Sequence, residues 1–139
     1  MKVTRTILLL GLLAGAVVLA ACGGGQPVAT EGPAISAEAQ KYASLVGDAT
    51  AGKQKLEGTC SSCHGPDAKG ISGLGKDLTT SEYAIGLPDA ELILFLAKGR
   101  PASDSLNTTG VDMPPRGGNP ALTDQDLADI VAYVRTLEK

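Results

Sequence analysis

The sequence predicts a small all-α domain in which short helices are separated by long loops. Three segments have both the composition and the capping residues of helices, and no segment alternates apolar and polar residues as a half-buried strand does. The segments between them are rich in glycine and proline. With 18 glycines, one phenylalanine and no tryptophan, the chain has few large side chains to fill a core. Loops this long usually surround something, and a flat apolar cofactor would complete such a core.

The chain begins with a segment typical of export. Lys2 and Arg5 precede an uninterrupted apolar and glycine run, residues 7–21. The run is about 15 residues long, which is shorter than the roughly 20 that a membrane-spanning helix needs. It ends in Leu-Ala-Ala before Cys22, and this ending resembles the lipobox of bacterial lipoproteins, in which the cysteine is acylated and becomes the mature N-terminus.

By that resemblance, residues 1–21 are a signal peptide and lipid on Cys22 holds the protein at the extracytoplasmic face of a bacterial membrane. Ordinary cleavage that leaves Cys22 free and an uncut anchor helix are the alternatives. Residues 22–47 are expected to form a lipid-anchored linker, because this stretch is polar and rich in Gly, Pro and Ala. Within it, residues 36–42 are good helix formers behind Ser36, a possible N-cap.

The remaining residues, 48–139, are expected to form a single folded domain. Its first helix is expected over about 50–61, with Asp48 or Thr50 as N-cap. The second begins near Pro88 and ends before Gly99, a natural C-cap.

The third helix has the clearest pattern. Thr123 and Asp126 form a near capping box, with aspartate in place of the usual glutamate. The apolar residues that follow at helical spacing are Leu127, Ile130, Val131, Val134 and Leu137.

The formal charge of −3 and the absence of any basic stripe exclude nucleic-acid binding as the function.

The sequence from Cys60 to His64 is Cys-Ser-Ser-Cys-His, the attachment signal for c-type haem. Two thiols add across the two vinyl groups of one porphyrin, so they must lie a few residues apart on one turn, and the adjacent His64 then reaches the iron. A zinc site is an alternative, but it would need a fourth ligand, and Cys22 is the only further Cys or His. A thioredoxin-like pair would need a βαβ context, and a disulfide between Cys60 and Cys63 would be strained and leave His64 unexplained.

The second axial ligand is expected to be Met113. His64 is the only histidine, so ligation by two histidines of one chain is impossible. Apart from Met1, which leaves with the leader, Met113 is the only methionine, and it lies in a Gly/Pro-rich loop before the last helix. It belongs to no apolar helix face, which argues against the alternative of a core-filling methionine. Ligation by His and Met raises the reduction potential of a haem.

From about Asp48 to Lys139, the sequence resembles a class I cytochrome c domain of bacterial type, which implies a small cytochrome c fold around one haem. Besides the C-x-x-C-H motif and Met113-Pro114, the resemblance rests on Gly52, on residues 75–78 and on Ala-Tyr-Val around Tyr133. In that family the first and last helices cross near the positions of Gly52 and Tyr133; the alternative is that both are merely local helix residues.

The family commonly has proline in a Gly-Pro-x-Leu segment, whose carbonyl holds the proximal imidazole. Lys76 takes that place here, so which carbonyl orients His64 is open. Arg100 is a candidate partner for a haem propionate, because guanidinium suits carboxylate, and a solvated surface arginine is the alternative. Tyr83 and Asn119 are weaker candidates for the same polar rim.

These residues predict an electron-transfer protein and not an enzyme, with one covalent haem c as cofactor. Two protein ligands fill both axial positions of the iron and leave no site for a substrate. A haem enzyme such as a peroxidase would need an open iron face and a distal acid-base group. A haem-based redox or gas sensor, in which Met113 dissociates, is the other alternative.

The chain length and the segment 113–120 are similar to those of monohaem subunits of bacterial respiratory complexes, such as alternative complex III. The expected partners are therefore redox proteins, or other subunits of a membrane electron-transport complex. If Asp67, Asp104 and Asp112 surround the haem edge, the partner surface should be basic.

Overall fold

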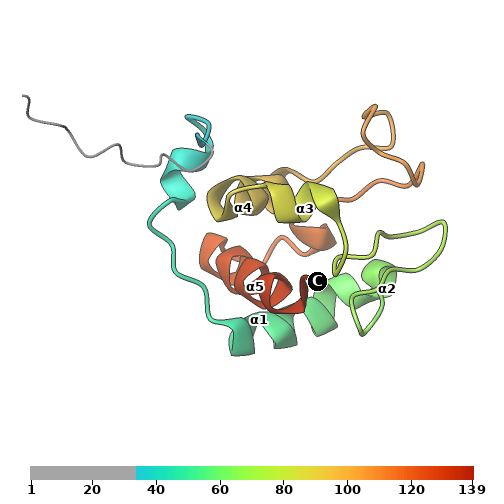
Figure 1. Cartoon of the computed structure of the whole chain (residues 1–139), viewed down its shortest axis with the longest axis horizontal. Coiled ribbons are helices and arrows are strands. Elements are labelled where there is room, and N and C mark those ends of the chain that lie inside the picture. The colour runs from blue at the N-terminus through green and yellow to red at the C-terminus, as the bar shows by residue number, and fades with distance from the viewer. Residues whose placement is uncertain (1–33) are drawn as a thin grey trace, which may run out of the picture. The chain divides into compact units, whose positions relative to one another are not determined.

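The computed structural model describes residues 34–139, so Cys22 and the expected signal peptide lie outside the described residues. Figure 1 shows the arrangement of its helices. In chain order these are η1 (Ala39–Tyr42), α1 (Ala49–Lys55), η2 (Leu56–Cys60), α2 (Ser61–His64), α3 (Glu82–Gly86), α4 (Asp89–Lys98), η3 (Pro115–Gly118) and α5 (Asp124–Leu137). Within residues 34–139, β-type pairing is limited to two isolated bridges, and no helix is both long and apolar enough to cross a membrane. The prediction of an all-α domain with long loops is confirmed.

Helices α1 and α5 pack against one another (Figure 1). Gly52 of α1 is buried, and a Cβ atom at this residue would lie 1.9 Å from the carbonyl oxygen of Asp129 in α5. Only glycine lets two helix backbones approach this closely. The close approach expected at Gly52 is therefore present, but it falls on Asp129, about one helical turn before Tyr133.

The core is formed by buried side chains of η1, η2, α4 and α5. Its largest fully buried side chains are Leu56, Ile93, Leu127 and Val131. The capping box expected at Thr123 opens α5: the Thr123 hydroxyl accepts from the Asp126 N–H at 3.1 Å, and the Asp126 carboxylate accepts from the Thr123 N–H at 2.7 Å.

Helix α4 has the expected bounds, with Pro88 as N-cap and Gly99 as C-cap at φ 71°. The first predicted helix is longer than expected, because α1, η2 and α2 follow one another without a break as far as His64. Helix α3 is an addition to the prediction; it has five residues, and the Ser81 hydroxyl caps it by accepting from the Ala84 N–H at 3.3 Å.

Residues 34–48, here called the strap, pack against α4 through η1 and against α5 through their last residues. Ala39 and Tyr42 of η1 are buried in the core, and Glu38 pairs with Lys98 of α4. The helix in this segment is a short 3₁₀ helix that begins at Ala39. The later half of the segment assigned to the linker is thus packed on the domain in this structure.

Candidate functional site

The cysteines of the C-x-x-C-H motif lie on the last turns of the continuous helix. The Ser61 N–H donates to the carbonyl of Leu56, five residues earlier, which is the bond of a π turn, so the turn that carries Cys60 is wider than an α-helical turn. Cys60 and Cys63 are half-buried free thiols. Burial, and secondarily the charge of Cys63, raises the pKa of the Cys60 thiol to about 11. Cys60 is therefore a neutral thiol at pH 7.

His64 is oriented by a backbone carbonyl. Its Nδ1 atom lies 2.8 Å from the carbonyl oxygen of Lys76. Because a carbonyl oxygen can only accept, Nδ1 carries the hydrogen and Nε2 presents a lone pair, which is the form in which imidazole binds a metal. The carbonyl left open by the sequence is thus that of Lys76, the residue that stands in place of the family's proline.

The loop that presents this carbonyl is folded tightly against the end of α2. The Gly70 N–H donates to the carbonyl of His64 at 2.7 Å. A Cβ atom on Gly75 would lie 2.3 Å from the carbonyl oxygen of Cys63, so only glycine lets the loop touch the motif here. The loop holds the Lys76 carbonyl in place through these contacts with the motif itself.

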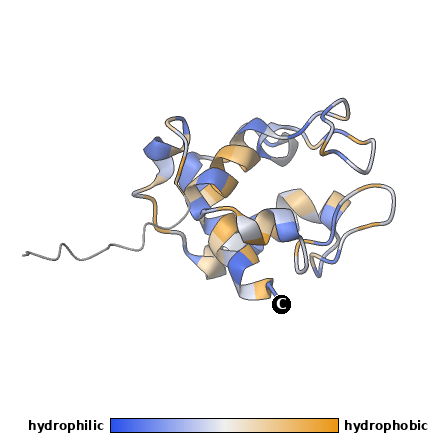
Figure 2. Cartoon of the chain, turned by 45° about the horizontal axis from the view of Figure 1, so that its top comes forward, coloured by the Kyte–Doolittle hydropathy of each residue, from blue (hydrophilic) through white to orange (hydrophobic). Residues whose placement is uncertain are grey.

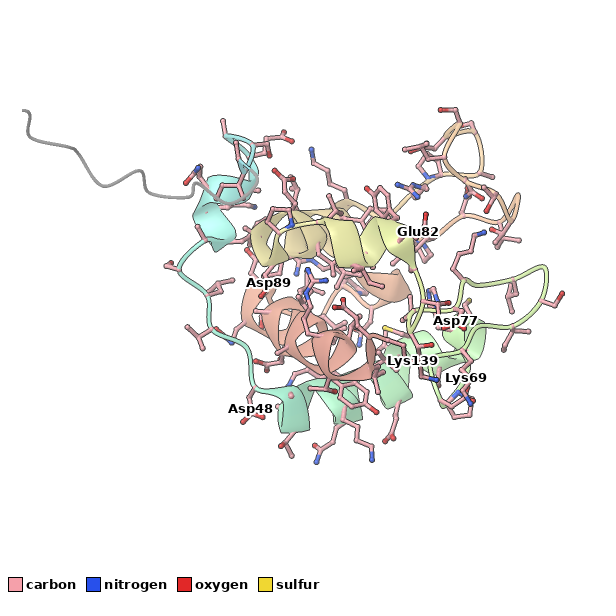
Figure 3. All side chains as sticks on the ribbon, in the orientation of Figure 1. Asp48, Lys69, Asp77, Glu82, Asp89 and Lys139 are labelled. Carbon is pink, nitrogen blue, oxygen red and sulfur yellow. The ribbon has the colours of Figure 1, made fainter. Side chains whose placement is uncertain are left out.

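The end of this loop is fixed by Asp77 and by the C-terminus. The Asp77 carboxylate accepts from the N–H and the hydroxyl of Thr79, both at 2.7 Å, and these bonds hold the pKa of Asp77 below its usual value. The Lys139 N–H donates to the carbonyl of Thr79 at 3.1 Å, and Figure 3 shows Lys139 and Asp77 in the same region. The last residue of the chain therefore helps to hold the loop that orients His64.

Met113 is half-buried and paired with the end of α4. Met113 and Arg100 exchange two backbone hydrogen bonds, of 2.7 and 2.8 Å. Gly99 has φ 71°, and a Cβ atom there would lie 2.2 Å from the carbonyl oxygen of Met113. The glycine that ends α4 therefore also admits the Met113 segment beside the helix.

Asn107 organises the loop that leads to Met113. Its Oδ1 atom accepts from the N–H groups of Thr109 and Gly110 at 3.1 and 3.0 Å. Its Nδ2 atom donates to the carbonyl of Val111 at 2.7 Å. No role was predicted for Asn107 from the sequence. An asparagine that lies two residues before a threonine and three before a glycine is nevertheless typical of a turn that the asparagine side chain closes.

The segment that follows Met113 lies against the first cysteine. A Cβ atom on Gly117 would lie 3.1 Å from Cγ2 of Thr59 and 3.7 Å from Sγ of Cys60. Asn119, a weaker candidate for the polar rim, donates to the Thr59 hydroxyl at 3.5 Å. The structure thus brings Cys60 and the Met113 segment together.

Arg100 is a buried arginine with one unsatisfied donor. Its guanidinium lies 4.2 Å from the centre of the Tyr83 ring and 4.8 Å from that of Phe95, and its side chain is 14% exposed. The Nε atom is buried and donates no hydrogen bond; Asp104 Oδ2, at 3.5 Å, is at ion-pair distance only. A further carboxylate would satisfy this donor. Arg100 is therefore not the solvated surface arginine that was the alternative.

These groups fit a c-type haem. The chain offers two free thiols on one helical stretch, an imidazole nitrogen with a bare lone pair, a thioether, and a buried guanidinium with a spare donor. Figures 1 and 2 show the loop after α2 and the loop after α4 projecting on the same side of the domain, and the loop after α2 contains an apolar stretch. Ile71 and Leu106, one in each loop, are large apolar side chains that remain 42% and 60% exposed.

Comparison with known proteins agrees with this chemistry. The sequence model of the cytochrome c family matches residues 49–138. Cytochrome c-555 of Prosthecochloris aestuarii is 32% identical over 87 residues, which are 63% of this chain and 85% of that protein. Cytochrome c-554(548) of Halomonas halodenitrificans is 33% identical over 92 residues, which are 66% of this chain and 99% of that protein.

Proposed function

The chain belongs to the cytochrome c family, and we propose that it is a membrane-anchored electron carrier, or a subunit of an electron-transport complex, with His64 and Met113 as axial ligands. As a family member it is an electron-transfer protein with a haem c covalently attached through Cys60 and Cys63. When bound, the haem iron supplies one-electron chemistry by alternating between its ferric and ferrous states. Bacterial c-type cytochromes are extracytoplasmic.

The single observation that carries the axial role of His64 is its bond to the Lys76 carbonyl. This bond fixes both the ring orientation and the tautomer, so Nε2 is left as the ligating atom. Because Gly75 and Gly70 seat the loop directly on the motif, the carbonyl that orients the imidazole is itself held in place.

Support for Met113 comes from its setting. A half-buried thioether is held between a backbone pair with Arg100 and the segment that touches Cys60. We expect Met113→Ala to keep the covalent haem, to lose the far-red charge-transfer band of the ferric protein, and to lower the reduction potential, because a soft ligand to ferrous iron is lost. Val46→Ala, at a strap residue that is 86% exposed, is the control and should leave both unchanged. An unchanged spectrum and potential in Met113→Ala would refute this ligand.

The ferric spectrum, together with carbon monoxide binding to the ferrous protein, separates the carrier from the sensor. A carrier with both axial positions filled should show the far-red band when ferric and should bind added carbon monoxide slowly when ferrous. A sensor, in which Met113 dissociates, would bind carbon monoxide rapidly and lose its Met signature.

Arg100 is proposed as a donor to a haem propionate. Its buried, unsatisfied Nε atom, in a guanidinium that lies against the Tyr83 and Phe95 rings, is the supporting observation. Because a nearby cation favours the ferrous state, Arg100→Gln should lower the reduction potential. Lys69→Gln removes an exposed lysine that pairs with Asp67 and is the control, with no change expected. Equal potentials in all three proteins would refute the role of Arg100.

The anchor is proposed from the sequence. Residues 1–21 would be removed as a signal peptide, and lipid on Cys22 would tether the domain through residues 22–47. Cys22→Ala should release a haem-loaded protein into the soluble extracytoplasmic fraction. Retention in the membrane would point to an uncut leader or to a tightly bound partner, and purification in detergent would show which redox proteins or complex subunits, such as those of alternative complex III, accompany it.

A further inference from the structure

Arg116 has an unusual backbone conformation directly after the Met113-Pro-Pro segment. Its φ is 55°, and Ala68 is the only other non-glycine residue with positive φ in residues 34–139. L-residues rarely adopt this left-handed conformation, and they hold it only when the surroundings supply compensating contacts. The side chain of Arg116 shows what those contacts are.

The guanidinium of Arg116 is bonded to the start of α5. One NH group donates to the carbonyl of Leu122 at 2.7 Å, and the other donates to the carboxylate of Asp124 at 2.5 Å. Asp124 is the first residue of α5, and the Arg116 side chain is only 26% exposed. A partly buried, charge-assisted pair of this kind is stronger than an exposed ion pair. Arg116 therefore ties its own backbone to a fixed helix end.

This tie closes a short span that contains Met113. On one side, Met113 is bonded to Arg100 through two backbone hydrogen bonds. On the other side, Arg116 is held by α5, and the two residues between them are prolines, whose φ is fixed by the ring. Gly117, the next residue, rests against Thr59 and Cys60. The position of the Met113 segment beside Thr59 and Cys60 therefore depends on both ends of this span.

We propose that Arg116 is a positioning residue, a latch whose bonds to Asp124 and to the Leu122 carbonyl keep the Met113 segment closed over the site. This inference rests on the proposed axial role of Met113. Without the latch, the segment keeps its backbone bonds to Arg100 and its contacts with Thr59, and it opens more often. By keeping the segment closed, the Arg116–Asp124 pair hinders the binding of external ligands at the axial position proposed for Met113.

The test measures how often the segment opens in the full-length, haem-loaded ferric protein. Imidazole is added at increasing concentration, and loss of the far-red band is followed by stopped flow; the rate at saturating imidazole equals the rate of opening. Arg116→Asn removes the guanidinium at a residue type that tolerates positive φ, so it adds no backbone strain. Asp124→Asn removes the partner charge instead.

We expect each variant to open about tenfold faster than the wild type, which corresponds to about 1.4 kcal/mol. The double variant should open no faster than Arg116→Asn alone, because Arg116→Asn already removes the bond that Asp124→Asn breaks. Arg116→Lys, which keeps the charge but loses the two-pronged geometry, should lie between them and the wild type. Lys69→Gln breaks an ion pair in the other loop, Lys69 Nζ to Asp67 Oδ2 at 3.2 Å, and should open at the wild-type rate.

An opening rate in Arg116→Asn within about twofold of the wild type, which is under about 0.5 kcal/mol, would overturn the latch. Equal acceleration by Lys69→Gln would also overturn it, because the effect would then be general loosening. If Arg116→Asn does not fold, Asp124→Asn and Arg116→Lys decide the question by the same rates. If Met113→Ala leaves the far-red spectrum unchanged, the axial role and the latch both fail, whereas an intact Met113 signature with an unchanged opening rate refutes the latch alone.

Discussion

Gly52→Ala should destabilise the domain far more than the addition of one methyl group suggests. The added Cβ atom would lie 1.9 Å from the carbonyl oxygen of Asp129 and 2.4 Å from its carbonyl carbon, in a place where ordinary contacts are at least about 3.2 Å. The obstacle is backbone on both sides, since Gly52 is in α1 and Asp129 is in α5. The two helices must therefore separate by more than an ångström along their whole contact.

Overpacking of a core costs about 1–3 kcal/mol, and an obstacle that cannot rotate away puts this substitution at about 3 kcal/mol or more. For a domain of about 100 residues, that loss lowers the melting temperature by roughly 12–24 °C. Thermal and urea unfolding of the haem-loaded protein, followed by helical circular dichroism, measures it. The melting temperature should fall while the urea slope stays the same.

The same continuous helix provides the matched control. A Cβ atom on Gly58, in η2, would have no atom within 4 Å, so Gly58→Ala should be neutral or stabilise by about 0.5–1 kcal/mol through helix propensity. Only the alanine at residue 52 should therefore lower the melting temperature. If Gly52→Ala melts at the wild-type temperature, the close approach of α1 and α5 is not a determinant of stability.

The contacts around Asp129, Tyr42 and the acidic loop residues give three further expected outcomes. Burial alone would raise the pKa of Asp129, but bonds from the Asp48 N–H, Gln125 and Lys55 hold that pKa below its usual value. The ionised carboxylate therefore stabilises the fold above about pH 4, and this stabilisation is lost as the pH falls through the pKa of the folded state. Asp129→Asn should accordingly cost about 1–3 kcal/mol at pH 7, and urea unfolding at pH 3 should show a much smaller difference from the wild type. Tyr42→Ala should cost about 3 kcal/mol, because this strap residue is 2% exposed, whereas Val46→Ala, at 86% exposure, should leave the unfolding free energy unchanged. Stopped-flow electron transfer to a basic soluble partner should slow as salt rises, because salt screens the attraction between unlike charges. The slowing should be about tenfold or less, because Lys69 and Arg100 partly neutralise Asp67 and Asp104; a rate that rises with salt would contradict an acidic docking face.

Much of the fold could be predicted because its signals are local. The capping box at Thr123, the proline before α4 and the glycine after it each fix a helix end through neighbouring residues. The five-residue helix α3 lacks any such periodic pattern, since it is little more than one turn behind Ser81. The π turn before Cys60 is a change in hydrogen-bond partner, which residue types do not reveal.

The site divides in the same way. Haem attachment through Cys60 and Cys63 could be predicted because the chemistry demands these residue types at this spacing. The role of the Lys76 carbonyl was not, because any residue has a carbonyl and only the folded loop shows which one faces His64. The contacts of Arg116 could not be predicted for a related reason. Its guanidinium reaches Leu122 and Asp124 at the start of α5 from a left-handed backbone conformation, which the sequence does not reveal.

The contact of Gly52 with Asp129 also determines when the domain can finish folding as the chain emerges. It joins a helix near the beginning of the folded region to α5, so an N-terminal fragment that stops before α5 lacks one side of it. A chain that emerges from its N-terminus first therefore displays Cys60 and Cys63 well before the domain can close. Closure waits for the last helix, and the bond from Lys139 to Thr79 forms with it. The long sequence separation makes this final step the entropically expensive one, and removal of α5 should leave the chain open rather than merely shortened.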